Sequence, residues 1–421
     1  MYWFTDPALK NLLPLAGASA FKGLSSTFRI PMLIMGANVL PEGPTLGGNF
    51  IDIIGPRCPR RRAFIVTDEY TASYAARVAR AMEAKGFATE TWDKAKPEPP
   101  LETVTQCAEV MSRFEPDVLV AVGGGSVIDC TKAAWILYER PDIKDLRLVS
   151  PMAPLGLRRK AFLIAFPTTS GTGSECTSVA VVTDTEAKRK VPLASGELLP
   201  DIAILTPDFV TGMPPKLTAG TGLDALAHAA DNVTSVGTND ICDALALRSI
   251  QMIFKFLPRA YHNGRDREAR FRMHIAATLA GIAFGQGGIG LTHALGHTLG
   301  KLFAIHHGVA VGLLIPYSFQ FYAPMTDKYL DICRALDIRA RTKERSLSLL
   351  VKKLKAFFKE LDLPVDLKGL GISLEAFNQN MDKLVTYSIE DPSAFGSPRP
   401  MTPEQCEKIF RYAYEGKDID F

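Results

Sequence analysis

The chain has few of the features that mark secreted, membrane-bound or nucleic-acid-binding proteins. Its seven cysteines are an odd number without a C-x-x-C pair, which argues against a disulfide framework and a structural zinc knuckle. Its 48 Lys plus Arg against 45 Asp plus Glu give a net charge of +3, too small to attract nucleic acid or anionic lipid. No run reaches the roughly 18 apolar residues of a membrane span, and the first residues lack a basic signal-peptide region. We therefore expect a soluble, cytoplasmic protein with no nucleic-acid or membrane partner.

The strand, glycine turn and helix expected over residues 118–132 match neither the G-x-G-x-x-G dinucleotide motif nor the G-x-x-x-x-G-K-[ST] P-loop. The whole chain has 421 residues, of which 47% are hydrophobic and 22% charged. At roughly 100–200 residues per domain, this predicts two domains, or one large one, with a substantial core.

The chain changes character near its middle. In the first half, continuous apolar runs at residues 63–67, 117–122 and 161–166 alternate with helical patterns, the first at 71–85. Such runs are typical of a parallel sheet covered on both faces, so we expect a Rossmann-like α/β domain over residues 28–210, beginning with a strand at 28–35. Helical periodicity dominates afterwards and predicts an all-α domain over residues 211–421, with helices at 223–233, 240–257, 267–283 and 346–361. Residues 1–27 form an N-terminal extension to which we assign no function.

A glycine-rich turn follows the second of these strands. Gly123, Gly124 and Gly125 lie between the predicted strand and a helix that begins near Ser126. Glycine lets the backbone approach a ligand closely, and a helix N-terminus attracts anions, so the segment suits a pyrophosphate. A tight strand-to-helix turn that needs glycine for geometry alone explains the triplet equally well.

A second polar loop follows the next strand. Residues 166–175 carry hydroxyl groups at Thr168, Thr169, Ser170, Thr172 and Ser174. Loops at the carboxyl ends of parallel strands line the ligand crevice of an open sheet, so both loops are expected to face one cofactor. A solvent loop with self-capping hydroxyls is the alternative.

A carboxylate, Asp68, stands at the end of the strand at residues 63–67. Such a group binds ribose hydroxyls and repels a 2′-phosphate, which favours NAD over NADP. The same residue is also common in ordinary turns.

All seven histidines lie in the second half, and several have the spacing of metal ligands. Asp224 and His228 are four residues apart, as are His293 and His297, and His307 follows fourteen residues after His293. Residues four apart share one helix face. A carboxylate with several imidazoles suits Fe(II), Zn(II) or Mn(II) with a position open to substrate. Two other histidines, His262 and His274, are interpreted as ordinary core or interface residues, and His306 stays open.

Taken in order, these motifs resemble the iron-dependent (group III) alcohol dehydrogenase family, over about residues 29–411. The resemblance implies a dehydroquinate synthase-like fold with a dinucleotide-binding domain, a helical metal domain and an active site between them. It implies four metal ligands, Asp224, His228, His293 and His307. It assigns His297 to a non-ligand role beside the nicotinamide, as the candidate catalytic residue.

The resemblance also assigns the cofactor-binding residues. These are the ribose carboxylate, the pyrophosphate turn with its helix, the hydroxyl loop and a cofactor-side lysine: Asp68, Gly124, Gly125, Ser126, Asp129, Thr168, Thr169, Thr172 and Lys190. Two positions depart from the family pattern. Asp231 stands where relatives commonly carry Glu, and Thr206-Pro207 where many carry Asp-Pro.

The expected activity is reversible, NAD-dependent oxidation of a primary alcohol or ω-hydroxy acid to the aldehyde, with a divalent metal as Lewis acid. Iron is the expected metal and NADP the less favoured nucleotide, and the resemblance implies a homodimer or larger homo-oligomer. The alternatives are polyol oxidation like that of glycerol dehydrogenases, sugar-phosphate cyclisation, and a non-catalytic cofactor-binding chain. Cyclisation would need a basic phosphate-binding cluster near the metal, and residues 281–300 contain none.

Overall fold

The computed structural model describes residues 28–40, 49–149, 151, 153–187 and 189–421. Contacts divide these residues into two compact units, Arg29–Gly212 and Met213–Phe421, each treated separately below. The predicted extension at residues 1–27 lies outside the described part of the chain, and the domain limits 28–210 and 211–421 stay predictions.

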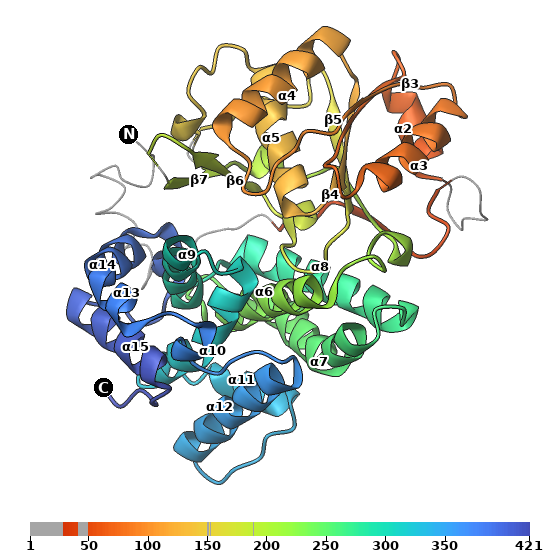
Figure 1. Cartoon of the computed structure of the whole chain (residues 1–421). Coiled ribbons are helices and arrows are strands. Elements are labelled where there is room, and N and C mark those ends of the chain that lie inside the picture. The colour runs from red at the N-terminus through yellow and green to blue at the C-terminus, as the bar shows by residue number, and fades with distance from the viewer. Residues whose placement is uncertain (1–27, 41–48, 150, 152, 188) are drawn as a thin grey trace. The chain divides into compact units, whose positions relative to one another are not determined.

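The first unit is built on a six-stranded parallel sheet (Figure 1). Its strand order is β1-β8-β5-β4-β2-β3, and every adjacent pair is parallel. The strands are β1 (Met32–Met35), β2 (Arg62–Val66), β3 (Ala88–Trp92), β4 (Val118–Gly123), β5 (Phe162–Pro167) and β8 (Ile202–Leu205). The predicted parallel sheet is confirmed, although β1 covers only the second half of the strand expected at residues 28–35.

Alternate residues of the central strands enter two different cores. Leu119 and Ala121 of β4 pack with α4 (Leu101–Phe114) and α5 (Gly125–Glu139). Val118 and Val120 pack on the opposite face with α2 (Phe50–Ile54) and α3 (Ala72–Glu83). Since side chains alternate between the two faces of a strand, a continuous apolar run is what a doubly covered sheet requires.

One element of the first unit departs from the alternating pattern. β6 (Val179–Asp184) and β7 (Arg189–Ala194) form an antiparallel hairpin in the part of the sequence that connects β5 to β8. The sequence interpretation missed this hairpin because its strands mix buried and partly buried residues and carry charged residues at the ends next to the turn, unlike the fully buried β4 and β5.

In the second unit, every element among the described residues is a helix. The α-helices are α6 (Pro215–Thr234), α7 (Asp240–His262), α8 (Arg267–Gly287), α9 (Leu291–Phe303), α10 (His307–Tyr322), α11 (Tyr329–Ala335), α12 (Lys343–Glu360), α13 (Leu374–Gln379), α14 (Met381–Glu390) and α15 (Pro403–Glu415), and the 3-10 helices are η8 (Lys368–Leu370) and η9 (Pro392–Gly396). The prediction of a helical second half is confirmed, with α6 extending eight residues before the predicted start at 223 because Pro215 suits the first turn of a helix.

The helix α6 is the centre of this unit. It is buried along most of its length and contacts α7, α8 and α10 (Figure 1). Because α6 is surrounded by other helices, its side chains face those helices rather than water. The packing of α6 therefore determines where its polar side chains lie.

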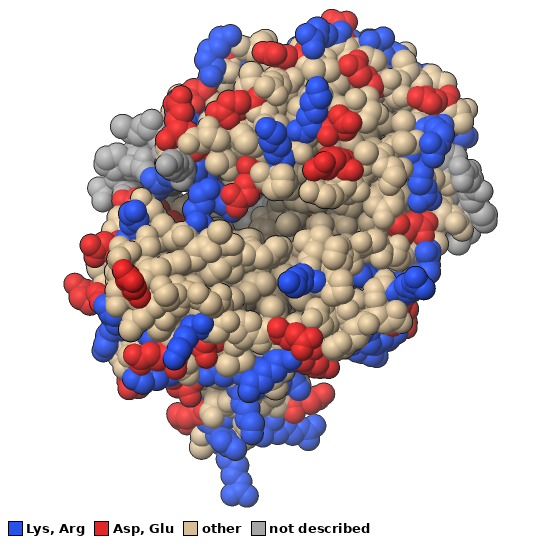
Figure 2. Space-filling view, in the orientation of Figure 1, with Lys and Arg blue, Asp and Glu red and all other residues tan. Residues whose placement is uncertain are grey.

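Two further observations concern the surface and the helices. Lys and Arg are interspersed with Asp and Glu over most of the face in Figure 2, in agreement with the small net charge.

Among the described residues, no single helix is both long and apolar enough to span a membrane. The helices α8 and α9 meet that test only as a pair, which is bent by 111°.

Candidate metal and cofactor sites

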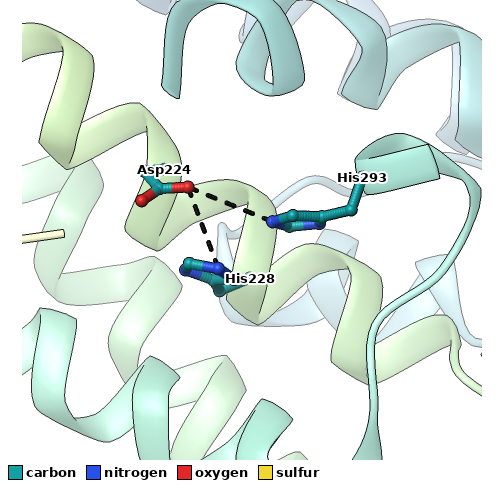
Figure 3. A group of neighbouring side chains, drawn as sticks. All are labelled: Asp224, His228 and His293. Atoms are coloured by element: carbon teal, nitrogen blue, oxygen red, sulfur yellow. Dashed lines mark ion pairs between the residues drawn. The ribbon is translucent and has the colours of Figure 1, made fainter. Parts of the chain in front are cut away.

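Three predicted metal ligands converge in the second unit (Figure 3). Asp224 and His228 lie one turn apart on α6, and α9 brings His293 to the same point. All three are buried, and one potential ligand atom from each lies within 4.8 Å of the other two. The Asp224 Oδ1 atom lies 3.8 Å from His228 Nε2 and 4.0 Å from His293 Nε2.

The fourth predicted ligand, His307, reaches the same carboxylate from α10, with Nε2 lying 3.2 Å from Asp224 Oδ1. It is outside the three-residue group, and its side chain is 32% exposed. The approach depends on Gly308, because a Cβ there would lie 1.9 Å from the carbonyl oxygen of Gly220. Glycine thus allows α10 to touch α6 where His307 begins its helix.

The cluster combines a buried carboxylate with imidazoles, and some of its buried polar atoms lack a partner that a bound cation would supply. Burial alone would raise the pKa of Asp224, but the facing imidazoles of His228 and His307 hold it well below its usual value. Burial lowers the pKa of His228 to about 3, so that ring is neutral at physiological pH. Asp224 Oδ1 and His293 Nε2 are buried without a hydrogen-bond partner among the described residues. Buried atoms of this kind are costly unless paired, so the donor set fits a divalent metal.

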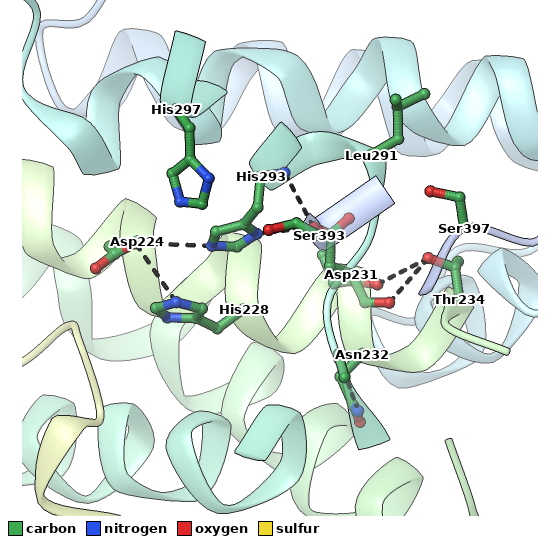
Figure 4. A network of polar contacts seen from close by, with 12 residues as sticks. Asp224, His228, Asp231, Asn232, Thr234, Leu291, His293, His297, Ser393 and Ser397 are labelled. Atoms are coloured by element: carbon green, nitrogen blue, oxygen red, sulfur yellow. Dashed lines mark hydrogen bonds and ion pairs between the residues drawn. The ribbon is translucent and has the colours of Figure 1, made fainter. Parts of the chain in front are cut away.

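A second carboxylate orients His293 from behind. The imidazole Nδ1 lies 2.7 Å from Asp231 Oδ2, and the backbone N–H of His293 donates to the same oxygen at 3.2 Å (Figure 4). A carboxylate only accepts, so Nδ1 carries the proton and Nε2 is left with a lone pair toward Asp224. The sequence marked Asp231 only as a departure from the family pattern, because its partner lies 62 residues away.

The predicted catalytic residue, His297, lies one turn after His293 on α9. Its ring stacks on that of His307 with centroids 5.1 Å apart, and its Nδ1 lies 2.9 Å from Asp391 Oδ2. Burial would raise the pKa of Asp391, but His297 and the hydrogen bonds to the carboxylate bring it below its usual value. The sequence interpretation missed Asp391, because nothing near it indicates a histidine 94 residues earlier.

The remaining histidines lie apart from the group of Asp224, His228 and His293. His274 is buried in α8, and burial lowers its pKa to about 4. His262 ends α7 and contacts Tyr261 edge-on. His306 packs against Gly220, where an added Cβ would meet the His306 ring at 2.5 Å.

In the first unit, the two predicted cofactor loops lie side by side, because β4 pairs with β5 in a register that sets Gly123 opposite Pro167. A Cβ on Gly124 would lie 3.1 Å from Thr169, and one on Gly125 would lie 2.7 Å from Thr172. The helix α5 begins at this point without a side-chain cap, and Thr169 Oγ1 is buried without a hydrogen-bond partner among the described residues. The two loops therefore lie together, and their geometry fits a pyrophosphate; that they bind one cofactor stays a prediction.

Other predicted cofactor residues have partners within this unit. Asp68 Oδ1 accepts hydrogen bonds from the Tyr70 and Thr71 backbone at 3.0 and 2.8 Å, which caps the turn before α3. Ser126 Oγ accepts from Glu98 N at 3.2 Å, and Lys190 Nζ lies 2.9 Å from Glu98 Oε1. Glu98 therefore links two predicted residues, although no motif in the sequence indicated it.

Asp129 and Lys132 form hydrogen bonds with the end of the hydroxyl loop and with the residues that follow it. The two carboxylate oxygens of Asp129 accept from Ser174 Oγ at 2.5 Å and Val181 N at 3.0 Å. Lys132 Nζ donates to the carbonyl oxygens of Ser174, Thr177 and Val179 at 2.7, 2.8 and 2.9 Å. Burial lowers the pKa of Lys132 to about 8, although Asp129 opposes the shift.

Comparison with known proteins agrees with this geometry. The profile described as iron-containing alcohol dehydrogenase matches residues 46–207, and the C-terminal profile of the Fe-containing alcohol dehydrogenase family matches residues 218–414. The NADPH-dependent butanol dehydrogenase of Clostridium saccharobutylicum is 36% identical over 346 residues, which are 81% of this chain and 87% of that protein. The chain belongs to the iron-containing alcohol dehydrogenase family. It is therefore an oxidoreductase, and the cofactors of this family are NAD and iron.

Two other similarities give the range of this family. The bifunctional aldehyde-alcohol dehydrogenase AdhE of Escherichia coli is 34% identical over 394 residues, which cover 85% of this chain but only 43% of AdhE. The sulfoacetaldehyde reductase of Bifidobacterium kashiwanohense, solved in complex with NAD+, has a TM-score of 0.78 at 26% identity and covers 93% of this chain and 99% of that one. The fold of these alcohol dehydrogenases thus extends over 93% of the chain, which spans 43% of AdhE.

Proposed function

We propose that this family member catalyses the reversible, NAD-dependent oxidation of a primary alcohol or ω-hydroxy acid to the aldehyde, at a divalent metal held by Asp224, His228, His293 and His307. One observation carries the proposal: three imidazole Nε2 atoms surround a single buried carboxylate oxygen at 3.2 to 4.0 Å. A divalent cation bound among these atoms would pair the carboxylate oxygen and the imidazole lone pairs without moving the helices.

The proposed ligands differ in burial, and this difference indicates their roles. Asp224, His228 and His293 are enclosed and fix the metal, whereas His307 is partly exposed and faces the open side of the group. When bound, the metal supplies a Lewis acid that polarises the alcohol or aldehyde oxygen. A bound nicotinamide cofactor would supply the hydride acceptor or donor. His297 is the residue that we assign to the reacting groups, because its ring stacks on His307 without joining the ligand group.

The cofactor side rests on the glycine turn and the hydroxyl loop. We infer that Gly124, Gly125 and Ser126 cradle the pyrophosphate at the start of α5, where added Cβ atoms would fill the space. Thr168, Thr169 and Thr172 complete that wall, and Asp68, Asp129 and Lys190 belong to the same cofactor set. The Asp68 carboxylate favours NAD over NADP, because it repels a 2′-phosphate.

We also propose that the protein is a cytoplasmic homodimer or larger homo-oligomer. Among the strands of the described residues, β1 lies at the edge of the sheet, and its Met32 and Met35 side chains are 50% and 55% exposed. Unpaired, apolar edge strands invite pairing with another chain. The seven cysteines are free thiols, in keeping with a reducing compartment. Light scattering after size exclusion should give at least twice the 45.9 kDa chain mass, and a mass of one chain would rule the oligomer out.

The decisive experiment measures NADH oxidation by protein reconstituted anaerobically with Fe(II), with a series of short aldehydes and semialdehydes. An Asp224→Ala variant is the control, with metal content measured for both proteins. Activity that requires iron and Asp224 supports the proposal. A best substrate among polyols such as glycerol would favour the polyol alternative, and iron-loaded protein that binds NADH without turnover of any substrate would favour a non-catalytic chain.

A further inference from the structure

We propose that Asp391 is a positioning residue for the reaction, which holds the imidazole of His297 so that Nε2 is its free acceptor atom. The inference rests on the proposed function, since it assigns a partner to the histidine placed beside the reacting groups. It adds to that site a segment, residues 391–397, that lies more than 80 residues beyond its last ligand, His307.

Both carboxylate oxygens of Asp391 have a hydrogen-bond partner. Its Oδ2 atom lies 2.9 Å from His297 Nδ1, and its Oδ1 atom accepts a hydrogen bond from the Ser393 backbone N–H at 2.8 Å. The second bond caps the short 3-10 helix Pro392–Gly396. The side chain of Asp391 is 15% exposed and that of His297 30%, so the pair is partly shielded from water while the ring keeps an open edge.

The backbone that carries Asp391 is itself anchored to the helical unit. Gly396 O accepts a hydrogen bond from Val236 N at 3.0 Å, and a Cβ on Gly396 would lie 1.9 Å from the carbonyl oxygen of Ile289. The Ser397 Oγ atom accepts from Tyr322 OH at 3.0 Å. The segment therefore has little freedom to move its carboxylate relative to α9.

The acceptor character of Asp391 decides which nitrogen of His297 carries the proton. An ionised carboxylate only accepts hydrogen bonds, so a neutral imidazole must place its proton on Nδ1 and its lone pair on Nε2. A base at a reaction centre is typically oriented in this way by a third group. The result is a ring with a defined direction and a defined tautomer.

The adjacent pair on α9 shows that the two histidines are held separately. His293 and His297 share one face of α9, but His293 takes its own carboxylate, Asp231, and is 1% exposed (Figure 4). His297 is the exposed member and contacts His307 by stacking. One carboxylate thus supports the ligand cluster, and the other supports the ring that is open to a small molecule.

The test is Asp391→Asn, because the amide cannot satisfy both neighbours as the carboxylate does. Ser393 N–H requires the oxygen, which turns the amide NH₂ toward His297 and moves the ring proton to Nε2. We expect kcat to fall by about 10²-fold or more, with KM for NADH changing little and metal content unchanged. Asp391→Glu, which keeps the acceptor, should recover part of the loss. Asp382→Asn, at an exposed position on α14, is the matched control.

Two further measurements separate positioning from folding and from the proposed function. In a double-mutant cycle, Asp391→Asn should cost nothing more in a His297→Ala background, whereas a merely structural role would add its full loss there. The ¹⁵N spectrum of histidine-labelled, zinc-loaded protein, assigned with His297→Ala, should show an Nδ1–H tautomer in wild type and its reversal in Asp391→Asn. An unchanged tautomer, or an additive double mutant, overturns the inference. If the wild-type protein turns over no substrate, the proposed function is overturned. The tautomer measurement then still shows whether Asp391 sets the proton position on His297.

Discussion

The imidazole of His293 donates its Nδ1 proton to Asp231 Oδ2 over 2.7 Å, while its Nε2 atom lies 4.0 Å from Oδ1 of the candidate ligand Asp224. Outer carboxylates of this kind fix the tautomer and direction of a metal-binding histidine. Because Asp231 is 1% exposed and on the same helix as Asp224 and His228, α6 supplies two of the proposed ligands and the support for a third.

Removing this support should weaken metal binding without removing a ligand. We expect Asp231→Ala to lower metal affinity by roughly 10- to 100-fold, because His293 loses its orienting acceptor. Asp231→Asn should lose less, since the amide oxygen still accepts from Nδ1. Competition with a chromophoric chelator measures both affinities. Equal affinity of the alanine variant and the wild type would show that Asp231 has no such role.

The contact between α6 and α10 gives a second prediction. A methyl group at Gly308 would lie 1.9 Å from Gly220 O and 2.9 Å from Asp224 Cβ, so Gly308→Ala should push His307 away from its partner. We expect weaker metal binding and a loss of stability of about 1–3 kcal/mol, as for other overpacked contacts. Gly196→Ala, where an added Cβ meets nothing within 4 Å, is the control and should change neither quantity in thermal melts or metal titrations.

Nucleotide preference should depend on Asp68. Asp68→Ser keeps an oxygen that can accept from the Tyr70 and Thr71 backbone but removes the negative charge. We expect the ratio of kcat/KM for NADPH to that for NADH to rise at least about tenfold, because the repulsion of the 2′-phosphate is lost. A wild-type enzyme that already prefers NADPH, as the butanol dehydrogenase relative is named to do, would contradict the role given to Asp68.

Stability should fall in acid partly because of His274. Burial lowers its folded-state pKa from 6.5 to about 4, so between these values the unfolded chain binds the extra proton. Its contribution is therefore complete above pH 6.5 and is lost as the pH falls toward 4. His274→Gln should reduce the loss of unfolding free energy between pH 7 and pH 5 by about 2 kcal/mol.

Urea unfolding at several pH values measures this difference for the His274 variant and the wild type. The matched control is His262→Gln, which removes a partly exposed histidine at the end of α7. If both variants keep the acid sensitivity of the wild type, His274 is not its source.

Local patterns in the sequence were enough for the parts of the protein that depend on neighbouring residues. The apolar runs predicted buried parallel strands, and the four-residue spacings of Asp224–His228 and His293–His297 predicted shared helix faces, because strand alternation and helix pitch are properties of the backbone itself. The glycine turn and the hydroxyl loop were predicted to meet because parallel strands end at one edge.

Only the tertiary structure decided which distant side chains complete the sites. Asp231 reaches His293 across 62 residues and Asp391 reaches His297 across 94, and Asp129 with Lys132 holds a loop more than 40 residues away. No periodicity encodes such pairs, since they depend on how α6, α9 and the segment 391–397 pack together. The sequence determined which residue types could serve as ligands and on which helices they lie. Packing determined which carboxylate faces which imidazole, because hydrogen bonds form only between groups that the fold brings within about 3 Å.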